Sequence, residues 1–223
     1  MKILEEPLIF SSLPQKNSHQ KRLKLIRSQG NEVSDNYKQF GKDYYDNPEV
    51  LQGFGGYHYD GRYQLCAEQI CKHIDFKTIL DFGCAKGFLL YEFLKLSKKI
   101  TGVDSSQYAL SQAKDEVKPF LYSKITDVPN TVLNELEIIL TRDVLPHLDY
   151  ASVYALLEYI QNQCSNLKLL YIEILVCNDE RTTAMLKDWD PTHVLLHNSQ
   201  WWNKLFSQFD LPYYIYYKDL FHN

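Results

Sequence analysis

The 223-residue sequence lacks several features that mark specialised classes of protein. No apolar run approaches the ~18 residues that a membrane-spanning helix needs, and the apolar start of the chain is too short for a signal-peptide core. The five cysteines include no Cys-x-x-Cys pair, which argues against a disulfide framework or a zinc knuckle. We therefore expect a cytoplasmic protein with reduced thiols, no membrane contact and no bound metal ion.

An excess of positive charge is also missing. Lysine and arginine number 24 against 28 aspartate and glutamate residues, which gives a formal net charge of -4. Such a chain has no overall field that attracts nucleic acid, so we do not expect a nucleic-acid partner and only a local basic patch stays open. The composition, with 45% hydrophobic and 23% charged residues, is that of a globular domain.

Glycine and tyrosine are distributed unevenly along the chain. All nine glycines lie between Gly30 and Gly102, and six tyrosines lie between Tyr37 and Tyr63. At the end of the tyrosine-rich stretch, glycines are interleaved with aromatic rings, which gives the flexibility and contact area that a lid over a ligand requires. We expect residues 1–60 to form a polar arm followed by this lid, with Tyr57 at the active site. For any single tyrosine, packing against a helix is the alternative.

From about residue 62 onward, short apolar runs alternate with segments of helical periodicity. This order is typical of a parallel sheet covered by helices on both faces. The expected strands cover residues 78–82, 100–104, 120–122, 137–141, 167–176 and 213–217, and Ser105 is the expected N-cap of the helix after the second strand. We predict a Rossmann-like, doubly wound α/β fold for residues 61–223, with a mainly parallel sheet and an antiparallel last strand.

A turn of small residues joins the first expected strand to its helix. The segment Asp81-Phe82-Gly83-Cys84-Ala85-Lys86-Gly87-Phe88 lets the backbone approach a ligand closely, and the following helix N-terminus offers unpaired N–H groups. Asp104 ends the second strand, where a carboxylate can accept hydrogen bonds from ribose hydroxyls. The NAD fingerprint fails because Ala85 and Phe88 stand where it needs glycine, and the Gly-Lys-Ser/Thr of an ATP-binding loop is missing. The alternative is an ordinary turn, with Asp104 as a helix cap.

This turn resembles the first motif of class I S-adenosylmethionine-dependent methyltransferases, an acidic residue followed by Gly-x-Gly-x-Gly. The sequence departs from the family at Ala85, which replaces the middle glycine, and at Lys124, where an acidic residue near adenine is common. The resemblance runs from about residue 60 to the C-terminus and implies that S-adenosylmethionine is the cofactor. The cofactor-binding residues that it implies are Arg62, Asp81, Gly83, Cys84, Ala85, Gly87, Phe88, Asp104, Ser105, Ile125, Thr141 and Arg142. Among them, Asp104 would hold the ribose and Arg62 the methionine carboxylate, with a surface ion pair as the alternative for Arg62.

A polar segment at about 177–204 follows the last expected core strand, where ligands of doubly wound sheets bind. We expect this insertion to form the wall of the acceptor site. If the acceptor is a hydroxyl it needs a general base, and His193, His147 or Asp190 can take that proton, with His193 the first choice. A structural role is the alternative for each of the three.

The resemblance therefore implies a methyltransferase that acts on a small polar metabolite, such as a sugar, a nucleotide sugar or a secondary metabolite. Two alternatives stay open. In the first, the acceptor is RNA or protein; in the second, the chain is a non-catalytic S-adenosylmethionine-binding partner subunit.

Overall fold

The computed structural model describes residues 2–4, 23–24, 26–28, 32–49, 54 and 56–220. Most of the predicted polar arm, together with Gly53 and Gly55 of the predicted lid, lies outside the described residues. The boundary that we placed at residue 60 stays a prediction.

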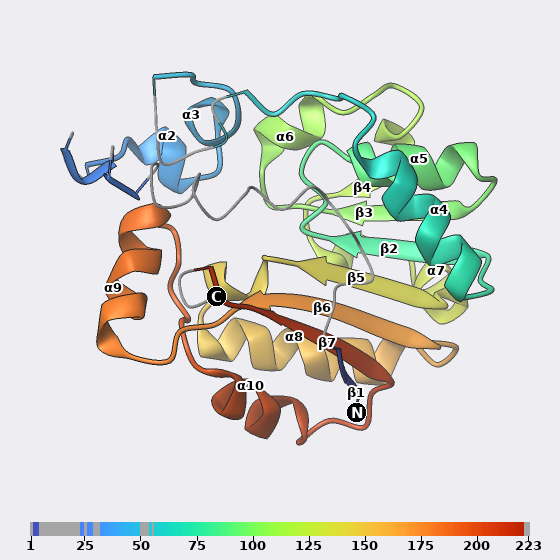
Figure 1. Ribbon diagram of the computed structural model, residues 1–223. Coiled ribbons are helices and arrows are strands. Elements are labelled where there is room, and N and C mark those ends of the chain that lie inside the picture. Colours follow the sequence, from blue (N-terminus) through green and yellow to red (C-terminus); the bar gives the residue numbers. More distant parts are fainter. Residues whose placement is uncertain are drawn as a thin grey trace.

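A parallel sheet runs through the centre of the molecule (Figure 1). Its described strands follow the order β1-β7-β6-β5-β2-β3-β4, and every described pairing is parallel. The strands are β1 (Lys2–Leu4), β2 (Thr78–Phe82), β3 (Lys99–Val103), β4 (Leu121–Tyr122), β5 (Ile138–Arg142), β6 (Leu169–Leu175) and β7 (Tyr213–Lys218). From β2 the chain winds outward to β4 and then returns to build β5, β6 and β7 on the other side. This confirms the predicted Rossmann-like fold, and it places the topological switch point between β2 and β5.

The predicted antiparallel last strand is wrong. β7 pairs with β6 in parallel, from Leu170 opposite Tyr213 to Leu175 opposite Lys218. After β6 the chain forms α9 (Glu180–Trp189) and α10 (Ser199–Phe206) before it enters β7. This long crossover carries the chain back to the end of the sheet where β6 began, so β7 runs in the same direction. A short run of tyrosines and isoleucine has no feature that specifies strand direction.

Helices cover both faces of the sheet. The remaining ones are α2 (Asp35–Lys38), α3 (Lys42–Tyr45), α4 (Tyr63–His73), α5 (Phe88–Lys95), α6 (Gln107–Ser111), α7 (Asn130–Glu135) and α8 (Tyr150–Gln163), with 3₁₀ turns η1 (Lys118–Phe120), η2 (Ile125–Asp127) and η3 (Leu145–His147). The N-cap of α6 is Ser106, whose hydroxyl accepts the N–H of Ala109 at 2.9 Å, and not the predicted Ser105. The prediction was one residue early because Ser105 and Ser106 are adjacent serines.

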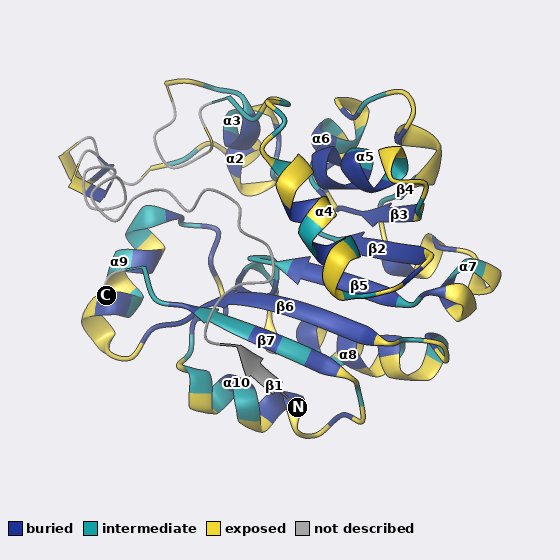
Figure 2. Cartoon of the chain, turned by 45° about the vertical axis from the view of Figure 1, so that its right-hand side comes forward, coloured by how far each residue is buried: buried dark blue, intermediate teal, exposed yellow. Residues whose placement is uncertain are grey.

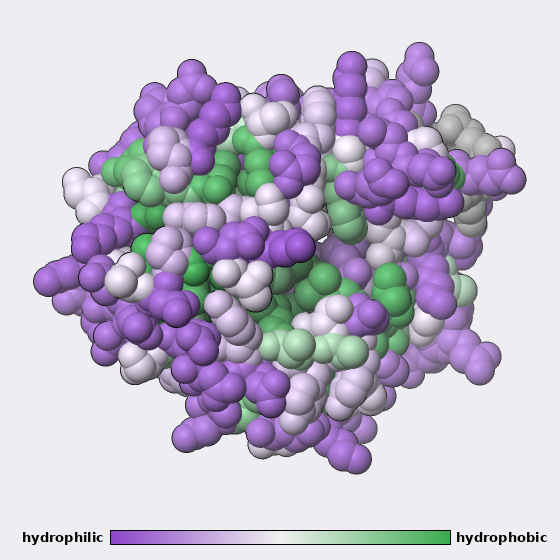
Figure 3. All heavy atoms as spheres, turned by 180° about the vertical axis from the view of Figure 1, so that it is seen from behind, coloured by the Kyte–Doolittle hydropathy of each residue, from purple (hydrophilic) through white to green (hydrophobic). Residues whose placement is uncertain are grey.

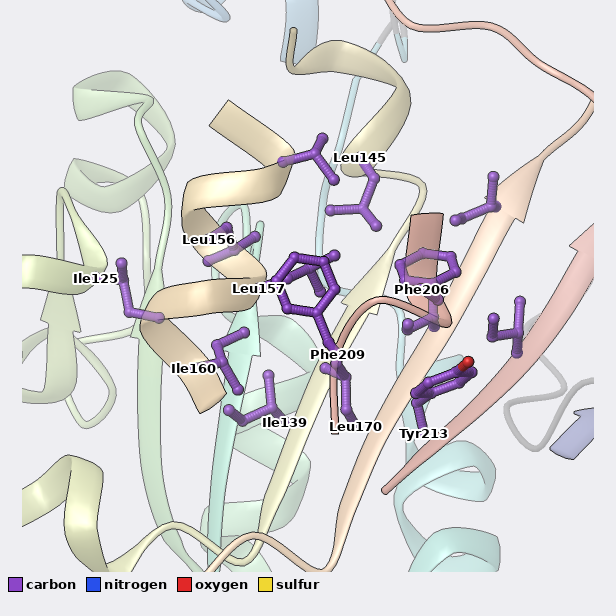
Figure 4. Packing of buried hydrophobic residues seen from close by; sticks show 14 of the residues in the cluster. Ile125, Ile139, Leu145, Leu156, Leu157, Ile160, Leu170, Phe206, Phe209 and Tyr213 are labelled. Carbon is purple, nitrogen blue, oxygen red and sulfur yellow. The ribbon is translucent and has the colours of Figure 1, made fainter. Parts of the chain in front are cut away.

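Successive strand residues alternate between two hydrophobic cores, as side chains of a strand must. One core packs the sheet against α4 and α5 and takes Ile79, Ile138, Leu140 and Tyr171. The other packs it against α8 and α10 and takes Leu80, Ile139, Leu170 and Ile172. Figure 4 shows part of this second core, where Leu156, Leu157 and Ile160 of α8 face Ile139 and Leu170 of the strands. Burial on both faces explains why the central strands are dark along their length in Figure 2.

The part of the chain before α4 lies against the body of the protein and does not stand apart from it. We call the described residues between 32 and 60 the lid segment. Its α2 and α3 lie at the end of the sheet where the strands finish (Figure 1). Its buried rings Tyr37, Tyr44 and Tyr45 form a cluster with Ala109 of α6, against which Ala85 also packs. The lid segment therefore packs against the turn of small residues between β2 and α5, which we call the glycine turn.

The surface is mixed in character. Seen from behind, apolar side chains show in separate patches between polar ones (Figure 3). Within the described ranges, no helix combines the length and the apolar character needed to cross a bilayer.

Candidate cofactor and acceptor site

The glycine turn between β2 and α5 adopts left-handed backbone at alternate residues. φ is +83° at Gly83, +50° at Ala85 and +67° at Gly87. A Cβ on Gly83 would lie 2.0 Å from Val144 Cγ2, so only glycine fits there. Ala85 takes the left-handed conformation at a cost of about 1–2 kcal/mol. The replacement of the middle glycine therefore leaves the shape of the turn intact.

Asp104 follows β3 and fixes this turn from the neighbouring strand. It is 9% exposed, and its Oδ2 accepts the N–H of Ala85 at 2.8 Å while Oδ1 accepts the N–H of Ser106 at 2.8 Å. Burial raises the pKa of Asp104, although these two N–H groups and the nearby His147 oppose the rise. Each carboxylate oxygen keeps acceptor capacity, which is the arrangement that two ribose hydroxyls require. Ser105, by contrast, is exposed.

Asp81 and Arg142 lie at the switch point, at the ends of β2 and β5. Burial raises the pKa of Asp81 to about 7, against the lowering effect of Arg142. The Arg142 guanidinium faces the Tyr63 ring at 5.8 Å, and its Nε lies 3.5 Å from Glu173 Oε2. The adjacent Thr141 has a buried hydroxyl that forms no hydrogen bond within the described part of the chain.

Arg142 belongs to a network of charged side chains that the sequence analysis did not predict. Glu173 is 1% exposed in β6, accepts the Tyr171 hydroxyl at 2.8 Å and pairs with Lys218 of β7 at 3.2 Å. Lys218 also pairs with Asp143, just after β5. The one signal was a lone carboxylate within the apolar run of β6, because a buried charge needs a partner.

The remaining predicted cofactor residues take different positions. Arg62 precedes α4, is well exposed and donates to Asp60 from Nη2 at 2.5 Å and from Nε at 2.7 Å, the surface pairing that we named as its alternative. Cys84 and Phe88 are buried beside the turn, and the Phe88 ring lies 5.1 Å from that of Tyr57. Ile125 is 9% exposed in η2 and belongs, with Val103, to the core that packs the sheet against α8 and α10.

Lys86 ties the lid segment to the glycine turn, and sequence reasoning missed it. The side chain is 6% exposed and donates to both oxygens of Asp46, at 2.7 and 2.6 Å, and to the carbonyl of Tyr57 at 2.7 Å. Tyr108 of α6 donates to the same carboxylate at 2.6 Å. A lysine within a glycine turn was visible in the sequence, but its partner lies 40 positions upstream.

Tyr57, whose carbonyl oxygen accepts the hydrogen bond from Lys86, also contacts Tyr63. Its hydroxyl is 3.0 Å from that of Tyr63, and burial raises its pKa well above the ordinary value. The phenol therefore stays neutral near pH 7, where it can donate a hydrogen bond but does not act as a base.

The structure brings the three predicted base candidates together. The rings of His147 and His193 lie 4.6 Å apart, and one donor atom each from His147, Asp190 and His193 lies within 4.8 Å of the others. His147 ends η3, directly after β5, and lies close enough to Asp104 to lower its pKa. The cluster therefore lies beside the carboxylate that we assign to the ribose.

His193 is a poor base in this position. It is 5% exposed, and burial together with His147 lowers its pKa to about 4. Its Nδ1 lies 3.2 Å from the carbonyl of Leu186 in α9. His147 is less buried and contacts the Phe40 ring of the lid segment at 5.5 Å, so it is the histidine nearer to the cofactor side.

The Asp190 carboxylate accepts hydrogen bonds from two tyrosines of the lid segment and from the nearby Thr192. It is 4% exposed, and it accepts hydrogen bonds from the hydroxyls of Tyr37 at 3.2 Å and Tyr44 at 3.1 Å. Thr192 donates its N–H at 3.0 Å and its hydroxyl at 2.6 Å to Oδ1. Although burial opposes the change, His193, His147 and these Thr192 hydrogen bonds lower the pKa of Asp190. Asp190 thus fastens the end of α9 to the lid segment.

Known proteins share this architecture. A solved S-adenosylmethionine-dependent methyltransferase from Archaeoglobus fulgidus matches with a TM-score of 0.49 and 18% identity over 66% of this chain and 67% of its own. The mitomycin 7-O-methyltransferase MmcR matches with a TM-score of 0.52 and 13% identity over 89% of this chain, and the small RNA methyltransferase HEN1 with 0.50 and 21% over 66%. This chain spans 63% of the MmcR chain and 20% of the HEN1 chain. At these identities, the two matches with TM-scores of 0.50 and 0.52 show the fold alone.

A comparison with curated protein sequences gave no significant match. A family model described as a methyltransferase domain matches residues 75–216, which is more than half of the chain. That range includes the glycine turn, Asp104, the switch-point residues, His147 and His193. The chain belongs to the class I S-adenosylmethionine-dependent methyltransferases, and S-adenosylmethionine is its methyl donor.

Proposed function

We propose that this methyltransferase acts on a hydroxyl group of a small polar metabolite, such as a sugar, a nucleotide sugar or a secondary metabolite. The observation that carries the proposal is the cluster of His147, Asp190 and His193 beside Asp104. A hydroxyl must lose its proton during methyl transfer, and imidazole and carboxylate groups can assist that loss near neutral pH. We infer that His147 is the member that faces the acceptor, because it is the less buried histidine on the cofactor side.

The cofactor half supports the same proposal. The left-handed turn around Ala85 and the open acceptor capacity of Asp104 fit a ribose. For the methionine part we propose Asp81 against the ammonium and Arg142 against the carboxylate, since both are at the switch point. Arg62 would first have to leave Asp60 to take that role.

Methyl transfer from a sulfonium is an in-line displacement, so the protein contributes chiefly by aligning the nucleophile and excluding water. The lid segment is suited to the second task, because Lys86 and Asp190 fix it on both sides of the site. We propose that the Lys86–Asp46 pair and the Asp190–tyrosine hydrogen bonds open together when ligands enter. Tyr57 is then the lid residue placed against the cofactor.

The charge of the chain and the cover over Asp190 support a small acceptor. The net charge of -4 provides no field for RNA, and the buried rings of Tyr37 and Tyr44 lie over Asp190. The proposal includes a reducing, cytoplasmic setting, which the five free cysteines support.

Two measurements test the proposal. Titration calorimetry should show binding of S-adenosylmethionine and S-adenosylhomocysteine, but not of NAD or ATP. A panel of hydroxylated metabolites, scored by release of S-adenosylhomocysteine, should then yield turnover that His147→Ala removes. His73→Ala is the matched control, because His73 is exposed at the end of α4 and lies outside the proposed acceptor wall. Turnover on RNA or protein, or cofactor binding without turnover on any acceptor, would favour the alternatives.

A further inference from the structure

His147, Asp190 and His193 have the composition of a metal site, although the sequence led us to expect none. Two imidazoles and one carboxylate are a recurrent ligand set for divalent transition-metal ions. We propose that these three side chains bind one such ion, of the class of Zn²⁺ or Fe²⁺. The first argument is their convergence, since a donor atom of each lies within 4.8 Å of the other two.

The second argument concerns the orientation of His147. Thr192 has a single hydroxyl proton, and its 2.6 Å hydrogen bond to the Asp190 carboxylate uses that proton. The 2.9 Å contact between Thr192 Oγ1 and His147 Nδ1 therefore needs a proton on Nδ1. In the neutral ring, the unprotonated nitrogen is then Nε2.

His193 is oriented in the same way. Its Nδ1 lies 3.2 Å from the carbonyl oxygen of Leu186, which only accepts, so Nδ1 carries the proton. Both histidines thus use Nδ1–H for a structural hydrogen bond and keep Nε2 as a ligand. Metal-binding histidines are almost always held like this, with the other ring N–H bonded to a carbonyl or another acceptor.

The third argument concerns charge. Asp190 is 4% exposed, and the four donors that it accepts, from Tyr37, Tyr44 and Thr192, are all neutral groups. None of the ion pairs formed among the described residues joins a lysine or an arginine to this carboxylate. Three of the donors go to Oδ1 and one goes to Oδ2, which leaves Oδ2 with a lone pair. Buried carboxylates are otherwise paired with a cation or coordinate a metal ion.

Binding requires the three ligand atoms to move closer together. Ligand atoms at about 2.0–2.1 Å from a tetrahedral ion lie about 3.3 Å apart, so the widest separation must shorten. The three residues are placed to allow this, because His147 ends a 3₁₀ turn while Asp190 and His193 lie in the loop after α9. Three protein ligands also leave at least one coordination position open.

The open position deepens the proposed function, and only this step rests on it. With Nε2 bound to the ion, His147 no longer takes the acceptor proton itself and acts through the ion. An ion here would bind the acceptor oxygen and lower the pKa of its hydroxyl, so that the proton passes to water. The oxygen then forms a bond to the methyl carbon while the carbon–sulfur bond breaks and its electron pair stays on sulfur. The products are the methyl ether and S-adenosylhomocysteine.

The experiment measures metal binding on the full chain without cofactor or acceptor. Protein dialysed against a chelator is titrated with Zn²⁺ by calorimetry and with Co²⁺ by visible absorption, which reports the ligand field. One ion per chain is expected. His193→Ala and Asp190→Asn should weaken Zn²⁺ binding by more than 100-fold. Thr192→Val removes the partner of His147 Nδ1 and the hydroxyl that donates to Asp190 Oδ1, but no proposed ligand, and should weaken it by about 10–100-fold.

His197→Ala is the matched control and should bind Zn²⁺ as the wild type does. Circular dichroism checks that each variant is folded. If Asp190→Asn does not fold, Thr192→Val still tests the site. No Zn²⁺ or Co²⁺ binding by the wild type, or equal weakening in His197→Ala, would overturn the proposal. A normal S-adenosylmethionine affinity in chelator would show that this failure leaves the cofactor half of the proposed function intact.

Discussion

The proposed cofactor half of the site, around the glycine turn and Asp104, and the proposed acceptor half, around His147, Asp190 and His193, are built in different ways. The cofactor half joins neighbours along the chain, since Ala85 and Asp104 are 19 residues apart and their hydrogen bond is between backbone and side chain. The acceptor half joins Asp190 to Tyr37 and Tyr44, 153 and 146 residues away, through side chains alone. A local motif serves a ligand that every member of the family shares. A long-range assembly can change with the acceptor, because few backbone positions constrain it.

The two halves also differ in how they handle a buried carboxylate. Burial raises the pKa of Asp81 to about 7 and also raises that of Asp104. The pKa of Asp190 is lowered instead, because two histidines and Thr192 surround it. We infer that the carboxylates of the cofactor half are completed by the cofactor, whereas Asp190 is completed by hydrogen-bond donors of the protein and by the metal ion that we propose.

The strongest test of the comparison removes one residue from the acceptor half. His147→Ala should lower turnover by ~10²–10⁴-fold, because the acceptor proton is then no longer taken up or displaced efficiently. The affinity for S-adenosylmethionine should change less than about threefold, since Asp104 and the glycine turn are untouched. Steady-state kinetics at saturating cofactor, together with calorimetry, separate the two quantities. A large loss of cofactor affinity would mean that the halves are not independent.

Asp81→Asn should measure how much the buried carboxylate of Asp81 lowers the free energy of unfolding. A folded-state pKa of about 7 against a reference of 3.8 means that the folded protein binds more protons than the unfolded chain between these values, so stability falls as pH rises through this window. The asparagine variant lacks this loss. It should be more stable than the wild type by up to about 4 kcal/mol at pH 8 and nearly equal at pH 4, as measured by denaturant unfolding. If the difference in stability between the variant and the wild type were the same at both pH values, the pKa of Asp81 would not be raised.

Asp104→Ala tests the ribose assignment. The variant should weaken S-adenosylmethionine by about 1–3 kcal/mol through loss of charge-assisted hydrogen bonds. Asp127→Ala is the control, because Asp127 is an exposed aspartate in η2. An unchanged dissociation constant for Asp104→Ala would make this carboxylate a support for the turn only.

The smallest expected effect concerns Ala85. Ala85→Gly should raise the free energy of unfolding by up to about 1 kcal/mol, because glycine adopts φ of +50° without strain. Ala67→Gly in the buried part of α4 should change stability in the opposite direction by about 1 kcal/mol. Thermal unfolding of both variants measures the difference. A loss of stability in Ala85→Gly would mean that the methyl group packs better than the strain costs.

Much of the cofactor half could be predicted from the sequence. The run Thr78–Phe82 is mainly apolar because both faces of β2 are buried. A glycine is required after it because a Cβ at Gly83 would lie 2.0 Å from Val144 Cγ2. The position of Asp104 follows from the end of β3. In each case the constraint acts within a few residues or across one strand pairing, so it leaves a readable pattern.

The acceptor half could be predicted only in part. The sequence identified His147, Asp190 and His193 as polar residues near the ends of strands, but it favoured His193, which the structure buries with a pKa of about 4. It contained no sign that Tyr37 and Tyr44 donate to Asp190, or that Lys86 pairs with Asp46. Partners so far apart in the chain are chosen by packing, which no local pattern records.

The sequence by itself therefore determined the alternation of strands and helices, the glycine turn and the carboxylate beside it, because periodicity and backbone freedom are properties of short segments. The tertiary structure decided the parallel direction of β7, the pairing of Glu173 with Lys218, and the meeting of two histidines with Asp190. These depend on which way the crossover through α9 and α10 returns, and on which buried charges find partners. Both are settled by long-range packing and the avoidance of unpaired buried charge.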